Sequence, residues 1–160
     1  MDDPQIDLKT LATAMTDGTP QSVALGFQFV SVEPCIGVLK VGWREDLVGD
    51  PDTGVIAGGV ITTLLDHVCG LSVKAAKADF SGTATLDLRI DYMRAAQPRR
   101  DIFGRAHCYK LTRSIAFVRA SAYEDDPDDP IATAQGAFVL TGAPTIAVPQ
   151  GATTRTGAKP

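Results

Sequence analysis

The chain has 160 residues, of which 44% are hydrophobic and 21% are charged, and its formal net charge is −4 at pH 7. This length suits one domain of roughly 100–200 residues, and the composition excludes a disordered, collagen-like or coiled-coil chain. The acidic balance argues against a nucleic-acid-binding protein, whose binding face is usually basic.

The first predicted element is a helix within residues 1–20, where hydrophobic residues recur at helical spacing before the stop signal Asp17-Gly18. Two apolar runs follow, residues 26–33 and 38–43. They flank a connection that contains Pro and Gly, which predicts a β-hairpin. The next segment, residues 46–53, is rich in Asp, Pro and Gly and predicts a loop.

The central predicted element is a long helix over residues 58–77, about 30 Å at 1.5 Å per residue. One face is an apolar stripe that should lie on a sheet; it consists of Val60, Ile61, Leu64, Leu65, Val68, Cys69, Leu71 and Ala75. The other face is mixed: Thr62, Thr63, Asp66, His67, Gly70, Val73 and Lys74. Small residues around a single acid favour a contact surface or a site over a solvated face, which usually carries Glu–Lys pairs.

Strands dominate the rest of the chain. Residues 83–92 alternate between apolar and polar side chains, and further strands are predicted at residues 102–110, 115–123 and 131–140. Residues 142–160 lack periodicity and predict a flexible tail. Strands on either side of one long helix predict an α+β fold, with an antiparallel sheet covering the helix in a single domain over residues 1–160.

Location and cofactors follow from what the sequence lacks. The N-terminus is acidic without an apolar run, and residues 60–73 contain Asp66 and His67, so we expect neither a signal peptide nor a membrane span. Three widely spaced cysteines form no disulfide or metal pattern and favour a reducing cytoplasm. No dinucleotide or phosphate-loop motif appears, so we expect neither a cofactor nor a metal.

Residues 57–70, Ala-Gly-Gly-Val-Ile-Thr-Thr-Leu-Leu-Asp-His-Val-Cys-Gly, resemble the start of the central helix in hotdog-fold acyl-CoA thioesterases. The most similar subgroup is the phenylacetate-pathway type, in which His-Gly-Gly precedes a Thr-rich turn and an acid. Residues 85–96 are similar to the family's next strand, and the likeness runs in matching order over about residues 26–141. The resemblance implies a hotdog fold, a long helix wrapped by about five or six antiparallel strands, assembled into dimers or tetramers.

The resemblance also implies a reaction, hydrolysis of an acyl-CoA thioester to the free acid and CoA. Carried over to this sequence, Asp66 is the nucleophile or general base, and the Gly58 backbone N–H binds the thioester oxygen. Thr85 helps to place the water or the carbonyl, and Asp50 lies in the loop where the family often has a polar residue. The family's His is Ala57 here, which removes any side-chain contact at that position but leaves the backbone donor.

The chemical properties of these residues support the same reaction independently of the resemblance. Gly58 and Gly59 at a helix N-terminus offer unpaired N–H groups and the positive end of the helix dipole, although tight helix–sheet packing also explains paired glycines. Asp66 suits a general base, or else a hydrogen-bonded structural acid. Among the basic residues of the later strands and turns, Arg100 and Arg113 are candidates to bind the phosphates of CoA, or they are edge charges that prevent aggregation.

Two other functions remain open from the sequence. A hydratase or dehydratase of acyl thioesters needs a His beside an acid, and only His67 could serve, although neighbours on a helix point about 100° apart. A non-catalytic acyl-CoA-binding protein would have no need of Asp66.

The predicted donor and acid lie far apart on one helix. Gly58 and Asp66 are separated by about 12 Å along the helix axis. One carbonyl therefore cannot contact both in the same chain. We expect a homo-oligomer with the active site at the subunit interface.

Overall fold

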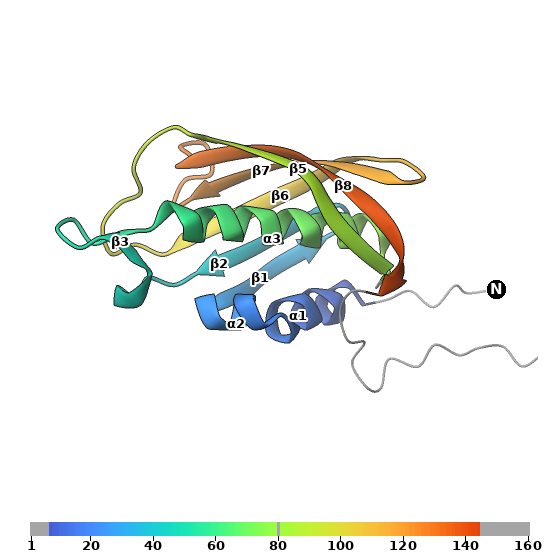
Figure 1. The fold of residues 1–160 in the computed structure, drawn as a ribbon, viewed down its shortest axis with the longest axis horizontal. Helices are drawn as coiled ribbons and strands as arrows, with labels where there is room; N and C mark the ends of the chain where they lie inside the picture. Colours follow the sequence, from blue (N-terminus) through green and yellow to red (C-terminus); the bar gives the residue numbers. More distant parts are fainter. Residues whose placement is uncertain (1–6, 80, 145–160) are drawn as a thin grey trace, which may run out of the picture.

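A computed structural model of the protein describes residues 7–79 and 81–144. The helices are α1 (Leu8–Gly18), α2 (Pro20–Leu25) and α3 (Gly58–Lys77), with a 3₁₀ turn at Glu45–Leu47. The strands are β1 (Phe27–Glu33), β2 (Ile36–Val41), β3 (Val48–Asp50), β4 (Val55–Ile56), β5 (Ser81–Tyr92), β6 (Ile102–Leu111), β7 (Ile115–Tyr123) and β8 (Ala132–Pro144). Six strands form one antiparallel sheet in the order β1-β2-β6-β7-β8-β5. This sheet curves around α3 (Figure 1), which confirms the predicted α+β, hotdog architecture.

Helix α3 has the predicted bounds, and all eight residues of its apolar stripe are buried. The stripe packs closely on the sheet because two strand residues that face it are glycines. A Cβ on Gly37 would lie 2.8 Å from Leu71 Cγ, and a Cβ on Gly104 would lie 3.0 Å from Leu64 Cγ. The helix ends where Ala78 adopts a left-handed conformation.

The second face of α3 is more covered than the sequence suggests. Gly70, Val73 and Lys74 are buried, and the space beside Gly70 is filled by Met15 of α1 and Phe138 of β8. Lys74 loses its hydration, which lowers its pKa, and its Nζ donates a 2.7 Å hydrogen bond to the Ser81 carbonyl. Only the N-terminal half of this face stays open to solvent.

Strand β5 departs from the predicted strict alternation at one residue. Its register with β8 shifts between Thr85 and Asp87, which leaves Leu86 in a β-bulge with 58% of its surface exposed. The bulge places Thr85 on the helix side together with Ile90 and Tyr92. The alternation in the sequence predicts that Leu86 shares a face of the sheet with Ile90 and Tyr92. That prediction is wrong for Leu86, because the extra residue in the bulge reverses the face on which the preceding side chains lie.

The N-terminal part and the loop before α3 contain more structure than expected. The predicted first helix is α1, whose N-cap Asp7 accepts hydrogen bonds from two backbone N–H groups. Helix α2 is absent from the predictions, because six residues are too few for a helical pattern. The predicted loop, residues 46–53, includes part of a two-stranded sheet of β3 and β4. Of the predicted tail, residues 142–144 belong to β8 and the remainder lies outside the described residues.

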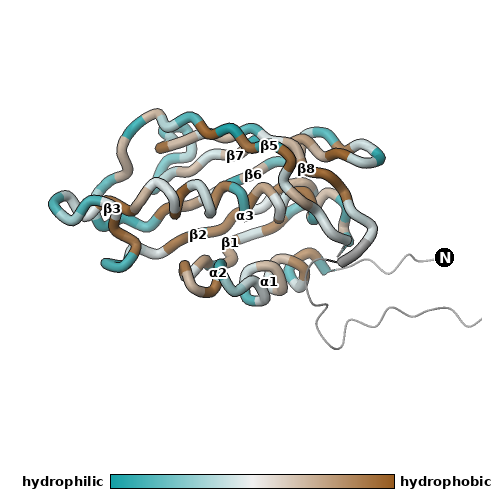
Figure 2. The backbone as a smooth tube through the Cα atoms, in the orientation of Figure 1, coloured by the Kyte–Doolittle hydropathy of each residue, from teal (hydrophilic) through white to brown (hydrophobic). Residues whose placement is uncertain are grey.

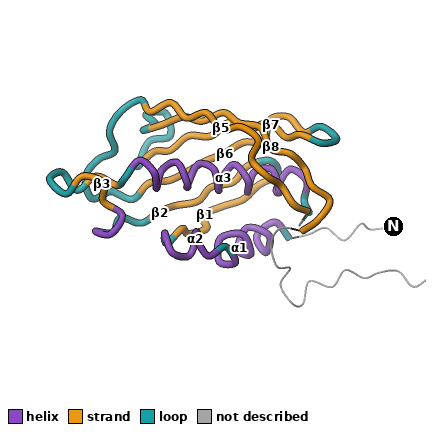
Figure 3. The backbone as a smooth tube through the Cα atoms, viewed as in Figure 1, coloured by secondary structure: helices purple, strands orange, loops and turns teal. Residues whose placement is uncertain are grey.

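Hydrophobic residues run along β2, whereas the tip of the β3–β4 hairpin is hydrophilic (Figure 2). The long loop from β5 to β6 passes beside the N-terminal end of α3 (Figure 3). No helix among the described residues has the length and apolar character needed to cross a membrane.

Candidate functional site

The start of α3 presents two free backbone donors. Gly58 and Gly59 are exposed, and within residues 7–79 and 81–144 neither N–H has a hydrogen-bond acceptor. Both backbone groups of the preceding residue, Ala57, are already hydrogen-bonded. Its N–H donates to the Leu47 carbonyl (2.9 Å), and its carbonyl accepts from the Val60 N–H (3.0 Å). The first turn of a helix has such unpaired donors, and the helix dipole adds positive potential there. This end of α3 can therefore bind an oxygen that carries negative charge.

A turn between β3 and β4 fixes this end of the helix. Gly54 adopts φ +74°, which favours glycine, and its carbonyl accepts hydrogen bonds from Trp43 Nε1 (2.9 Å) and the Arg99 N–H (3.3 Å). The β3–β4 hairpin, the end of β2 and the β5–β6 loop thus meet beside the start of α3 (Figure 3).

The predicted site residue Asp50 stabilises the same turn. Its carboxylate accepts hydrogen bonds from the Asp52 N–H (3.1 Å) and the Thr53 hydroxyl (2.8 Å). The neighbouring Gly49 lies against Ala57, since a Cβ at Gly49 would be 2.7 Å from Ala57 Cα. Ala57 therefore packs against the β3–β4 hairpin at Gly49. The hydrogen bonds of Asp50 stabilise the conformation of the loop that leads to α3.

Asp66 and Thr85 are brought together by the structure. Asp66 lies on the partly open face of α3, and the Thr85 hydroxyl of β5 donates a 2.8 Å hydrogen bond to its Oδ1. That bond leaves Oδ2 without a partner among the described residues. The pair has the geometry of a carboxylate that is oriented by one donor and still free to accept a proton from water.

A second polar contact links β5 to the start of α3. The Tyr92 hydroxyl donates a 2.6 Å hydrogen bond to the Gly58 carbonyl and lies 3.0 Å from Thr62 Oγ1. Neither Thr62 nor Tyr92 is among the sequence-predicted site residues. The feature of the sequence that points to Tyr92 is its position at the end of the strand that follows the long helix.

The structure does not bring His67 together with the other predicted residues. Its ring lies toward β1, 5.9 Å from Phe27 by ring centroids, and hydrogen-bonds to the Met15 backbone. Burial lowers the pKa of His67, despite that hydrogen bond and the adjacent charge of Asp66. A neutral ring on this side of α3 does not face the Asp66–Thr85 pair.

No cysteine near the site is an activated nucleophile. Burial raises the pKa of the Cys69 and Cys108 thiols, so both stay protonated at neutral pH. Among the described residues, no three His, Cys, Asp or Glu side chains are placed to hold a metal ion. The nucleophilic or basic group nearest the open part of α3 is therefore the Asp66 carboxylate.

The two predicted phosphate-binding residues lie at opposite ends of the sheet. Arg100 is in the β5–β6 loop near the start of α3 and forms an ion pair with Asp125. Arg113 is in the β6–β7 turn, beside Ser114, whose carbonyl accepts from Leu140 near the beginning of β5. Arg113 is exposed and has no ion pair with the described residues. Of the two, Arg100 is in the loop that bonds to the hairpin before α3, through the Arg99 N–H and the Gly54 carbonyl.

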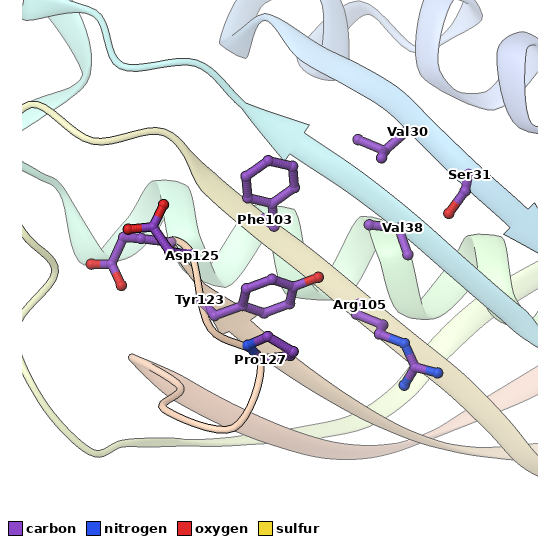
Figure 4. A pocket seen from close by; sticks show the side chains of 9 residues that line it. Val30, Ser31, Val38, Phe103, Arg105, Tyr123, Asp125 and Pro127 are labelled. Atoms are coloured by element: carbon purple, nitrogen blue, oxygen red, sulfur yellow. The ribbon is translucent and has the colours of Figure 1, made fainter.

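A shallow hollow lies elsewhere, on the face of the sheet opposite α3 (Figure 4). It encloses about 460 Å³ and is lined by Val30, Ser31, Val38, Phe103, Arg105, Tyr123, Glu124, Asp125 and Pro127. The Phe103 and Tyr123 rings stack there, with centroids 5.8 Å apart. None of the predicted site residues lines it, so it is separate from the open end of α3.

Comparison with known proteins identifies relatives. Residues 53–131 match the family model of the thioesterase superfamily, a segment that contains α3 and β5. A candidate esterase of Halobacterium salinarum is 31% identical over 103 residues, which cover 61% of this chain and 67% of that protein. A solved structure from Pseudomonas aeruginosa is 38% identical, with a TM-score of 0.77, and covers 83% of this chain and 98% of its own.

More distant structures share the fold. The PaaI protein from the phenylacetic acid degradation operon of E. coli is 13% identical, with a TM-score of 0.76 over 89% of this chain and 99% of its own. A thioesterase family protein from Silicibacter pomeroyi is 20% identical, with a TM-score of 0.71 over 82% of this chain and 98% of its own. Both place α3 and the curved sheet in a widely shared architecture.

Proposed function

This chain belongs to the thioesterase superfamily, and we propose that it hydrolyses an acyl-CoA thioester to the free acid and CoA. The observation that carries the proposal is the Asp66–Thr85 pair beside the open N-terminal half of α3. A thioesterase needs a base or nucleophile at the carbonyl carbon and a donor for the developing oxyanion. Asp66 supplies the first group, and the start of α3 supplies the second.

In the proposed reaction, the thioester oxygen accepts a hydrogen bond from the Gly58 N–H at the start of α3. The exposed Gly59 N–H is available to the same oxygen, and a glycine pair leaves the backbone open to a close approach. Such a donor is worth about 2.7–4 kcal/mol of barrier when it is aimed at the oxyanion. The alanine at position 57 does not weaken this donor, because the contact uses only the backbone.

Asp66 acts on the carbonyl carbon, as a general base toward water or as the nucleophile. In the general-base route, its free oxygen takes a proton from water while the Thr85 hydroxyl holds the other oxygen. The hydroxide equivalent then adds to the carbonyl, and the C–S bond breaks while Asp66 returns its proton to the leaving sulfur, so that CoA is released as the thiol and Asp66 is again a carboxylate. The reaction needs no metal or cofactor, because both groups belong to the chain.

The proposal extends to a homo-oligomer with shared active sites. Along α3, Gly58 and Asp66 are separated by about 12 Å, so one carbonyl cannot be within hydrogen-bond reach of both in one chain. Two observations support a partner: β5 is an edge strand of the sheet, and three large residues, Leu86 and Tyr92 on β5 and Met93 directly after it, are exposed. An antiparallel pair of α3 helices about a two-fold axis would place each Asp66 near the partner's Gly58.

The test is a panel of acyl-CoA esters with aryl, short and long acyl groups, with CoA release followed by a thiol-reactive dye. We expect release from at least one ester by the wild type and little release by Asp66→Asn. Tight binding without release from any ester would favour a non-catalytic binding protein. Loss of enone absorbance with trans-2-enoyl-CoA, without thiol release, would indicate a hydratase.

A further inference from the structure

The polar contact between Tyr92 and Gly58 has a defined donor order. A carbonyl oxygen can only accept, so the single phenolic proton of Tyr92 is donated to Gly58 O. The second contact of the Tyr92 oxygen, at 3.0 Å from Thr62 Oγ1, must then be one that Tyr92 accepts. The hydroxyl of Thr62 therefore donates to Tyr92, and Tyr92 donates to the Gly58 carbonyl.

Tyr92 is held at this place by the strand that carries it. The bulge at Leu86 turns the end of β5 so that Tyr92 faces α3, and the next residue, Met93, is fixed by its N–H bond to the Ile131 carbonyl (2.8 Å). The Tyr92 side chain keeps 50% of its surface exposed, so it covers the start of α3 without closing it. The ring thus lies beside Gly58, the first residue of α3.

We propose that Tyr92, supported by Thr62, is a positioning residue for the oxyanion donors at the start of α3. The Gly58 carbonyl belongs to the same peptide group as the Gly59 N–H, so a hydrogen bond to this oxygen fixes the direction of that N–H. It also polarises the peptide, because linked hydrogen bonds strengthen one another. The inference rests on the proposed function, since it assigns these residues to the donors of that reaction.

A purely mechanical role would look different. Tyr92 does not fill a gap that only glycine allows, because a Cβ on Gly58 would lie 3.4 Å from its hydroxyl, an ordinary contact. If the contact only tied β5 to α3, its loss would change stability and leave turnover per folded molecule unaltered. If the contact positions the donors, its loss changes the Gly59 amide and kcat, while substrate binding stays nearly constant.

The experiment compares Tyr92→Phe, Thr62→Val and the double variant, all as full-length protein. We expect Tyr92→Phe to lower kcat about tenfold, the effect of losing one hydrogen bond in the transition state, with KM within about twofold. Thr62→Val should have a smaller effect, and the double variant should match Tyr92→Phe because the two hydroxyls act in series. Thr62→Ser keeps the donor and should restore wild-type kcat.

Tyr109→Phe is the matched control, because Tyr109 is similarly exposed but stacks with Arg119 on the other face of the sheet. The independent readout is the Gly59 amide in ¹H–¹⁵N spectra, whose proton should move upfield in Tyr92→Phe but not in Tyr109→Phe. An unmoved Gly59 resonance, or wild-type kcat in Tyr92→Phe, overturns the inference. Failure of the wild type to release CoA from any ester overturns the proposed function instead, and the amide shift still decides the positioning.

Discussion

The Thr85 hydroxyl of strand β5 donates a 2.8 Å hydrogen bond to Asp66 Oδ1 on helix α3. The two residues are 19 positions apart and meet because β5 returns along the helix that precedes it. One oxygen of the carboxylate is thereby fixed, and the other is left for chemistry. This pair and the free donors at Gly58 and Gly59 together form the proposed reactive groups.

Removal of the Thr85 hydroxyl should lower turnover without loss of substrate binding. In Thr85→Val the Asp66 carboxylate loses its only side-chain donor among the described residues, so we expect kcat to fall about tenfold, the effect of losing one hydrogen bond in the transition state, with KM nearly unchanged. Thr85→Ser should behave like the wild type. Thr83→Val makes the same change two residues earlier on β5 and should be neutral, and equal effects of the two Val variants would rule out a specific role for Thr85.

Sharing of the site between subunits can be tested by mixing two inactive variants. Chains with Asp66→Asn are reassembled with chains that carry Gly58→Val, whose side chain would obstruct the approach to the helix N-terminus. In a mixed dimer, one of two sites combines an intact Asp66 with an intact Gly58, so activity should return to at most half of the wild type. Mixed dimers that form, as shown by native mass spectrometry, but remain inactive would exclude a shared site.

The stability of the protein should fall as the pH drops below about 6.5, the ordinary pKa of His. Burial lowers the pKa of His67, so the folded state holds the ring neutral while the unfolded chain takes up a proton. The contribution of His67 to the free energy of unfolding is fully present above the pKa that the ring has in the unfolded chain. It decreases as the pH falls from that value toward the lower pKa of the folded state. Urea unfolding at pH 7.5 and 5.5 should show this decrease in the wild type and in His107→Gln, but a smaller one in His67→Gln. An identical decrease in all three would contradict the assignment.

The ion pair of Arg94 and Glu124 should be structural. Glu124 is buried, which alone would raise its pKa, but hydrogen bonds from Arg94 and the Gln97 N–H hold the pKa below its usual value. Arg94→Met leaves this carboxylate unpaired and should reduce the free energy of unfolding by about 3 kcal/mol. Arg89→Met breaks only the exposed pair with Asp91 and should cost less than about 1 kcal/mol. Similar losses in both variants, measured by chemical denaturation, would contradict this account.

The sequence predicts the central helix and the sheet strands well because their patterns are local. Residues 58–77 combine a continuous apolar stripe with a glycine pair at the start, and α3 has those bounds. The antiparallel sheet follows from several short apolar runs joined by turns. The β-bulge at Leu86 could not be predicted, because the pairing of β5 with β8 determines it and the local alternation gives no sign of it.

The site is only partly visible in the sequence for a similar reason. Asp66 and Gly58 stand out through their place on the one long helix, but the tyrosine hydrogen bond joins residues 34 positions apart. The burial of Gly70, Val73 and Lys74 depends on where α1 and β8 pack, which helical periodicity does not contain. Arg100 and Arg113 are both candidate phosphate ligands by sequence, and only the folded chain shows that Arg100 forms an ion pair with Asp125.

The most direct test of the central claim is the kcat of Asp66→Asn on an acyl-CoA ester that the wild type cleaves. Asparagine keeps the size of the side chain and an acceptor for the Thr85 hydroxyl, so the fold and substrate binding should persist. Asp87→Asn, at an exposed carboxylate on β5, is the control and should retain wild-type turnover. We predict that Asp66→Asn lowers kcat by at least about 100-fold with little change in the Kd for the ester. Near-wild-type turnover in Asp66→Asn would remove Asp66 from the reaction and contradict the account.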